Sequence, residues 1–144
     1  MVLLTFVSCE KKDTDTFVDL GLTSGTKWQS VTAYTYRTYA EASQLTEGQI
    51  PTKAQFEELI SQCKWEWTGT GYKIIGPNGK YITLRAAGKK YKGYDEIADK
   101  DHIGCYWSST KMEEGIVYYL EFTTERHEID YQSAEGYASV CAVK

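Results

Sequence analysis

The sequence predicts one small α+β domain in which hairpins of antiparallel strands pack against one or two short helices. Its 144 residues suit a single domain. The chain has 12 Tyr and 4 Trp but only 4 Phe, and Tyr and Trp favour strands and half-exposed sheet faces. One stretch has the apolar spacing of a helix, whereas most others alternate with a period of two and end at turn residues.

The clearest helix is expected from Lys53 to Cys63. Thr52 is a favourable N-cap, and Gln55, three residues later, completes a capping box. Apolar side chains then recur with helical spacing, at Phe56, Leu59, Ile60 and Cys63.

A shorter helix is expected over residues 39–45, where Thr38 and Glu41 form a second capping box. Hairpins are expected on both sides of these helices, because alternating segments flank Gly-rich turns such as Gly76-Pro-Asn-Gly. A long polar loop is expected over residues 86–105, a length that is often functional. The expected strands are residues 17–22, 27–31, 72–75 and 80–85, followed by a four-stranded meander of residues 106–110, 116–122, 127–131 and 137–143.

Charge excludes one class of partner. The net charge is -4, and the densest basic cluster, Lys89, Lys90 and Lys92, is followed directly by acidic residues. A nucleic-acid-binding domain would need a basic face across the whole domain, so we expect no nucleic-acid partner. No run approaches the ~18 apolar residues of a membrane span.

The N-terminus resembles a bacterial lipoprotein signal. Residues 1–8 are mostly apolar, Ser8 is small, Cys9 follows, and the chain then turns polar. In such signals the thiol of the cysteine is lipidated, and after cleavage this cysteine is the first residue of the mature protein. Multiple acyl chains give stable anchoring. We therefore expect residues 1–9 to be the signal segment ending at lipidated Cys9, residues 10–16 to be a tether, and residues 17–144 to be the domain.

The apolar run is short for an export signal, and no Lys or Arg precedes it. We therefore expect that the start is placed late or that the true N-terminus is missing from the sequence. The alternative is that the first residues form a buried strand.

Several segments of the body resemble one family. Phe17-Val-Asp-Leu-Gly-Leu-Thr-Ser-Gly-Thr-Lys-Trp, Ile50-Pro-Thr-Lys-Ala-Gln-Phe, Tyr106-Trp-Ser-Ser-Thr and Gly136-Tyr-Ala-Ser-Val-Cys-Ala-Val are similar to motifs of the Fibrobacter succinogenes major paralogous domains of Bacteroidetes. The segment between Trp28 and Ile50 is shorter than is usual in that family, and Cys141 and Ala142 replace its usual Arg-Pro.

The resemblance implies a compact C-type-lectin-like fold, related to the formylglycine-generating enzymes, and export as a lipoprotein of the outer membrane, at the cell surface or facing the periplasm. No enzymatic activity is expected. No motif around the cysteines matches the copper-binding pair of those enzymes. We expect a non-enzymatic, monomeric binding domain for a glycan or protein. The alternatives are a structural or adhesive part of a larger envelope assembly and, ranked last, an envelope hydrolase.

The sequence offers no convincing catalytic or metal site. Ser108 and Ser109 are expected to satisfy buried backbone groups beside a core Trp107, and the acidic residues at 95–101 are expected to be solvated rather than calcium-binding. Cysteines 63, 105 and 141 lack zinc-site spacing. A bridge between Cys105 and Cys141 is possible, which would leave Cys63 unpaired.

A candidate ligand-binding surface comes from the long loop, a meander turn and the outer positions of one strand. The alternative is that these side chains are simply solvated. The surface would comprise Tyr91, Tyr94, His102, Lys111, Glu113, His127, Asp130 and Tyr131.

Overall fold

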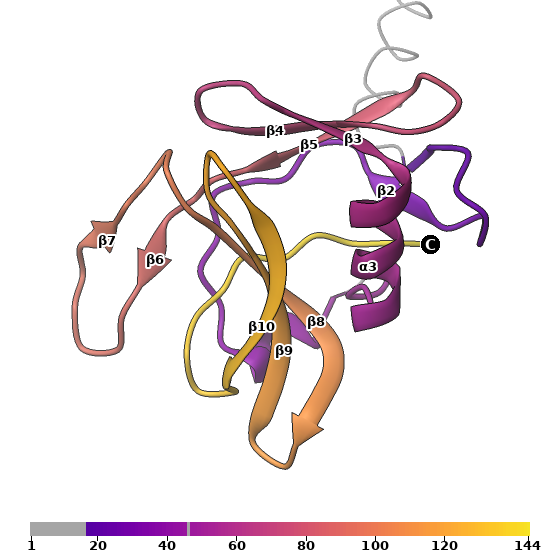
Figure 1. Cartoon of the computed structure of the whole chain (residues 1–144). Helices are drawn as coiled ribbons and strands as arrows, with labels where there is room; N and C mark the ends of the chain where they lie inside the picture. The colour runs from indigo at the N-terminus through magenta and orange to yellow at the C-terminus, as the bar shows by residue number, and fades with distance from the viewer. Residues whose placement is uncertain (1–16, 46) are drawn as a thin grey trace, which may run out of the picture.

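Four small antiparallel sheets and two short helices form the part of the chain that the structure, a computed structural model, describes: residues 17–45 and 47–144 (Figure 1). The predicted α+β class is confirmed at this level. The predicted lipidation site Cys9 and the tether over residues 10–16 lie outside the described residues.

Two of the sheets are the predicted hairpins. Strand β1 (Phe17–Asp19) pairs with β2 (Lys27–Gln29). Strand β4 (Gly71–Ile75) pairs with β5 (Tyr81–Arg85), and β3 (Lys64–Trp67) joins the free side of β4. The turn of the second hairpin contacts the first, because the side-chain amide of Asn78 donates a hydrogen bond to the carbonyl of Asp19 at 2.8 Å.

Both predicted capping boxes are present. Thr38 and Glu41 open α2 (Tyr39–Ala42), and Thr52 and Gln55 open α3 (Lys53–Gln62). The helix α3 ends one residue earlier than predicted, because Cys63 is its extended C-cap. Its apolar stripe buries Phe56 and Leu59 completely.

The largest sheet has the order β10-β9-β8 and divides the core in two. It consists of β8 (Gly104–Glu113), β9 (Ile116–Phe122) and β10 (His127–Ser133). Successive strand residues face opposite sides, so Tyr106, Leu120 and Phe122 join the cluster around Trp28, Phe56 and Leu59. The other face contributes Cys105, Trp107, Val117 and Tyr119 to a second cluster.

The predicted fourth strand of the meander is wrong. Residues 137–143 are extended but form only isolated bridges: Ala138 with Arg37, Ser139 with Tyr106, and Val143 with Trp28 and Gln49. This segment crosses the middle of the molecule in Figure 1. It is mostly apolar like a buried strand, but its partners change every few residues, so no ladder forms.

The predicted long loop over residues 86–105 is only partly correct. It is interrupted by a hairpin of two short strands, β6 (Lys89–Lys90) and β7 (Ile97–Ala98), and β8 begins at Gly104. The hairpin projects to one side of the molecule in Figure 1. Strands of two residues carry too little alternation to be recognised in a sequence.

Candidate functional site

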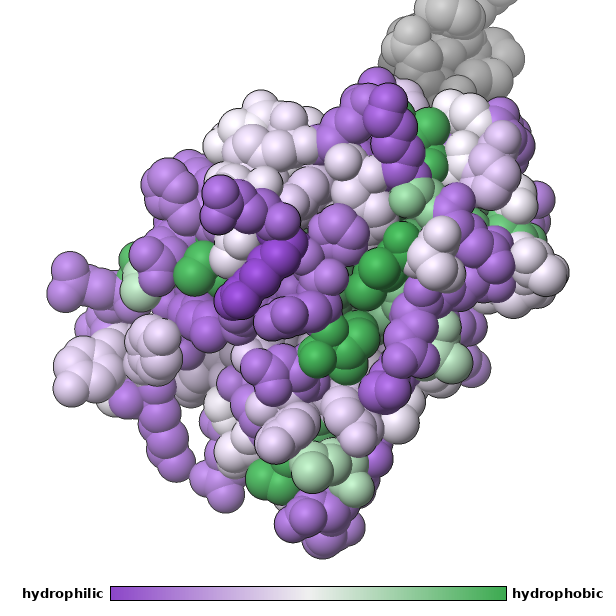
Figure 2. All heavy atoms as spheres, viewed as in Figure 1, coloured by the Kyte–Doolittle hydropathy of each residue, from purple (hydrophilic) through white to green (hydrophobic). Residues whose placement is uncertain are grey.

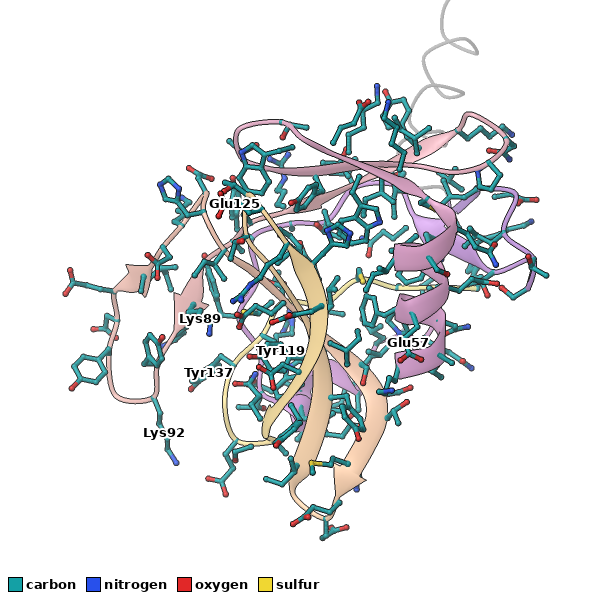
Figure 3. The ribbon with its side chains drawn as sticks, in the orientation of Figure 1. Glu57, Lys89, Lys92, Tyr119, Glu125 and Tyr137 are labelled. Carbon is teal, nitrogen blue, oxygen red and sulfur yellow. The ribbon has the colours of Figure 1, made fainter. Side chains whose placement is uncertain are left out.

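A small cleft lies between the β6–β7 hairpin and the β8–β9–β10 sheet. It has a volume of about 100 Å³ and is here named the lysine–tyrosine cleft. Figure 3 shows Lys89 and Tyr137 beside this gap and Lys92 at the turn of the hairpin. The cleft is lined by Lys89, Lys90, Tyr91, Lys92, Cys105, Gln132, Gly136 and Tyr137.

Larger hollows occur elsewhere but gather fewer ionisable groups. One of about 300 Å³ beside α2 is lined by no charged side chain, and one of about 450 Å³ near Tyr34 has Arg85 as its single charged lining residue. A third, of about 260 Å³, has two, Arg37 and Glu41. A ligand site is expected to place a few convergent polar groups beside aromatic surface. The lysine–tyrosine cleft fits this description best, although it is the smallest of these four hollows.

Local backbone contacts set the shape of the hairpin. Its turn is closed by a hydrogen bond from the Tyr94 amide to the Tyr91 carbonyl at 3.1 Å. Gly93 takes the third position of this turn with φ of +87°, a conformation that favours glycine. At the base, the amide of Gly88 donates to the carbonyl of Ile103 at 2.8 Å. These bonds hold the hairpin in the shape that places Lys90, Tyr91 and Lys92 at the cleft.

A buried carboxylate lies beside the cleft and fixes Lys89. Glu121 is only 8% exposed. Its Oε1 lies 2.9 Å from Lys89 Nζ and accepts a hydrogen bond from the Tyr119 hydroxyl at 2.9 Å. Its Oε2 lies 3.3 Å from Arg126 Nη2. Because Lys89 belongs to β6 and Glu121 to β9, this network joins the hairpin to the sheet.

The network shifts the proton equilibria of its members. Burial alone disfavours the charged form of Glu121, but the hydrogen bonds from Lys89 and Tyr119 outweigh it and lower the pKa of the carboxyl. Burial opposes the charge on Lys89 as well, yet its hydrogen bond to Glu121 leaves the lysine pKa raised. Both groups are therefore charged at neutral pH. Burial and the contact with Glu121 raise the pKa of Tyr119, which stays a hydrogen-bond donor.

The outer part of the cleft carries two further ammonium groups. Lys90 Nζ lies 4.8 Å from the ring centroid of Tyr137 and donates to the carbonyl of Tyr94 at 2.9 Å. Lys92 Nζ lies 3.3 Å from Glu135 Oε1, and both side chains of this pair are highly exposed. Such an ion pair contributes little to stability, so Lys92 can exchange its partner at little cost.

The structure divides the predicted residues of β10 between two faces. His127 and Tyr131 lie four residues apart and share one face of the strand. Asp130 is separated from each of them by an odd number of positions and therefore lies on the other face. The ring of His127 stacks on Trp65 at 4.2 Å, and the ring of Tyr131 packs edge-on against Tyr118. Asp130 is the cross-strand partner of Tyr119. The three side chains therefore cannot form one surface.

The remaining predicted residues also lie apart. Tyr91 lines the cleft, and Tyr94 is in the same hairpin. Lys111 and Glu113 lie at the distant end of β8, next to the β8–β9 turn, where Lys111 approaches Glu114 at 3.8 Å. His102 is exposed in the turn before β8. Of the eight predicted residues, only Tyr91 lines the cleft.

Most of the candidate nucleophiles are buried or half-buried. Ser108 is fully buried, and its hydroxyl donates to the carbonyl of Tyr118 at 2.7 Å, which confirms its predicted role in satisfying backbone groups. Ser109 is exposed. Cys63, Cys105 and Cys141 are all free thiols. Burial raises the pKa of Cys63 to about 11 and that of Cys105 to about 12, so neither is a thiolate at neutral pH.

His127 lies in a partly buried, aromatic environment, stacked on Trp65. Burial lowers the pKa of His127, and its Nδ1 is buried without a hydrogen-bond partner among the described residues. Within residues 17–45 and 47–144, no three His, Cys, Asp or Glu side chains gather as metal ligands. No helix in this part of the chain is long and apolar enough to cross a membrane.

The residues that line the cleft were mostly missed as a binding surface. Lys89, Lys90 and Lys92 stand out as a basic cluster in the sequence, but that cluster alone did not indicate a cleft. Gln132 and Tyr137 carry no local signal at all, because they reach the hairpin only through the fold. Lysines alternating with Tyr91 and Tyr94 were the available clue.

Comparison of the chain with protein-family models, with curated protein sequences and with solved structures found no match. The site is therefore interpreted from its own geometry.

Proposed function

We propose that this protein is an exported, lipid-anchored, non-enzymatic binding protein of the bacterial envelope, which recognises a glycan or protein ligand. The Cys9 signal pattern supports the anchor. The resemblance to the Fibrobacter succinogenes major paralogous domains supports export and a C-type-lectin-like arrangement of the observed sheets and helices.

The observation that carries the binding proposal is the lysine–tyrosine cleft. It combines the ammonium groups of Lys90 and Lys92 at its mouth with a base that is tied to the sheet by the Lys89–Glu121 ion pair. Sites that bind ligands place a few polar groups on a pre-formed support. The hydroxyl of Ser108 is bonded to the backbone, and the thiols of Cys63 and Cys105 are protonated at neutral pH, which favours binding over catalysis at these residues.

Binding through the cleft is tested by two matched pairs of alanine substitutions. The variant Lys90→Ala/Tyr137→Ala removes a lysine–tyrosine pair in the cleft, with 4.8 Å between ammonium and ring. The control, Lys73→Ala/Tyr81→Ala, removes a similar pair at 4.3 Å on the β4–β5 hairpin. On glycan and protein arrays, the cleft variant should lose about tenfold or more in affinity, as for central contact residues.

The control variant should bind like the wild type, and thermal unfolding should show that both variants are folded. Equal losses in the two variants, or no ligand bound by the wild type above an unrelated domain, would count against the proposal.

The anchor is tested by metabolic labelling with palmitate. The wild type should be labelled and Cys9→Ala should not, because the acyl chains are attached at this residue. Cys63→Ala removes a half-buried thiol from the domain and should be labelled like the wild type. Equal labelling of wild type and Cys9→Ala, or no labelling of either, would show that Cys9 is not the anchor.

A further inference from the structure

We propose that the lysine–tyrosine cleft binds a carboxylate-bearing sugar at the end of an acidic glycan. This inference rests on the proposed binding function and specifies its ligand class. Three features support it: the charge left unbalanced at the mouth of the cleft, the size of the cleft, and the tyrosines beside it.

The charge at the mouth favours an anion. Lys89 is paired with Glu121 beneath the cleft, and Lys92 is paired with Glu135 at the rim. Among the described residues, no carboxylate lies within ion-pair distance of Lys90. Its contacts are the Tyr94 carbonyl and the Tyr137 ring. An ammonium has three donors, so Lys90 retains donors for a ligand oxygen.

The size of the cleft limits what can enter. A volume of about 100 Å³ is well below the roughly 300–1,000 Å³ of sites that enclose a drug-sized ligand. It admits one acidic group and part of the ring that carries it, so the rest of the ligand must extend over the surface. Tyr91 and Tyr94 lie there, 53% and 68% exposed.

A glycan fits this surface better than an acidic peptide does. A sugar has apolar C–H faces and polar edges, which match the apolar body and polar tip of tyrosine. A peptide that adds to a sheet needs a strand edge long enough for a hydrogen-bonded ladder. The strands β6 and β7 have only two residues each, which is too short.

The Lys92–Glu135 pair provides a test, because substitutions of its two members should change the ligand affinity in opposite directions. Glu135 occupies the ammonium that an incoming carboxylate would use, so it competes with the ligand. Lys92→Gln should weaken binding and Glu135→Gln should strengthen it, although both substitutions break the same 3.3 Å ion pair. If the ion pair only maintained the shape of the cleft, the two substitutions would act in the same direction.

The experiment measures dissociation constants of the full chain in detergent for polygalacturonate, alginate and hyaluronan, which carry carboxylates and no sulfate. For at least one of these glycans, Lys92→Gln should raise the dissociation constant about threefold or more and Glu135→Gln should lower it about twofold to fivefold, the range of exposed ion pairs. Lys90→Gln should raise it about tenfold, as expected for a charged hydrogen bond, and Lys90→Arg should retain much of the affinity. High salt should weaken binding.

The exposed pair Lys64–Glu66, with 3.1 Å between its charged atoms, supplies the control, and Lys64→Gln and Glu66→Gln should change nothing. Several outcomes would overturn the inference: Lys92→Gln and Glu135→Gln acting alike, or equal binding of neutral dextran, sulfated dextran or polyglutamate. If a neutral glycan binds through the cleft, the proposed function stands and the acidic ligand fails. If no ligand of any kind binds, both fail.

Discussion

Replacing Glu121 with alanine is expected to lower the free energy of unfolding by about 2–3 kcal/mol, because removing one member of a buried ion pair leaves its partners unpaired. Glu121 holds Lys89, Arg126 and the Tyr119 hydroxyl together. The value lies below that of a fully buried pair because the Lys89 and Arg126 side chains are 29% and 54% exposed and can turn to water. Urea unfolding measures the change.

Glu128 provides the matched control. It also pairs with Arg126, at 3.5 Å, but it is half exposed, so Glu128→Ala should cost less than about 1 kcal/mol. Equal losses from Glu121→Ala and Glu128→Ala would mean that burial of the network does not contribute to stability.

The same network predicts a dependence of stability on pH. The pKa of Glu121 is lowered on folding, so its stabilising effect is present above the usual carboxyl pKa of about 4.3 and is lost as pH falls through the lowered value. The pKa of Lys89 is raised, so its effect is present below about 10.4 and is lost as pH rises through the raised value. The stability difference between wild type and Glu121→Gln should therefore be constant near neutral pH and should shrink in acid.

Replacing Gly104 with alanine is expected to cost about 2–3 kcal/mol by overpacking the core. A Cβ atom at this position would lie 2.1 Å from Cζ of Phe122, the cross-strand partner of Gly104. The ring has no room to move, because Phe122 is fully buried and packs against Tyr72 and Tyr106.

A double-mutant cycle identifies the steric cause. Phe122→Leu alone should cost about 1–2 kcal/mol for lost ring contacts. Combined with Gly104→Ala, it frees the space that the new methyl needs, so the double variant should be more stable than the sum predicts by about 1 kcal/mol or more. Gly136→Ala, where the new Cβ meets mainly the flexible end of Gln132 at 3.0 Å, should cost much less. Strict additivity in the cycle would contradict a clash with Phe122.

Local sequence signals predicted the elements that are formed by neighbouring residues. Thr52 and Gln55 predicted the start of α3, and Gly76-Pro-Asn-Gly predicted the turn between β4 and β5, and the structure confirms both. Capping and tight turns depend on side chains within four residues of each other, which a sequence displays directly.

Local sequence signals gave wrong predictions where the structure depends on contacts between residues far apart in the sequence. Residues 137–143 are mostly apolar, as in a buried strand, but they cross the domain and pair only in isolated bridges with several partners. The sequence predicts one outer surface for His127, Asp130 and Tyr131, yet their spacing along β10 places them on two faces, one of which packs Ile129 against the core.

The sequence by itself determined the α+β class, both helix starts, the main hairpins and the structural role of Ser108. It also supplied the Cys9 signal pattern, which lies outside the described residues and stays a prediction. Only the tertiary structure decided that Lys89, Glu121 and Arg126 form one network, and that Lys90 and Tyr137, 47 positions apart in the sequence, line one cleft. The physical reason is that side-chain contacts across such separations depend on how the sheets pack, and no local pattern of residues specifies that packing.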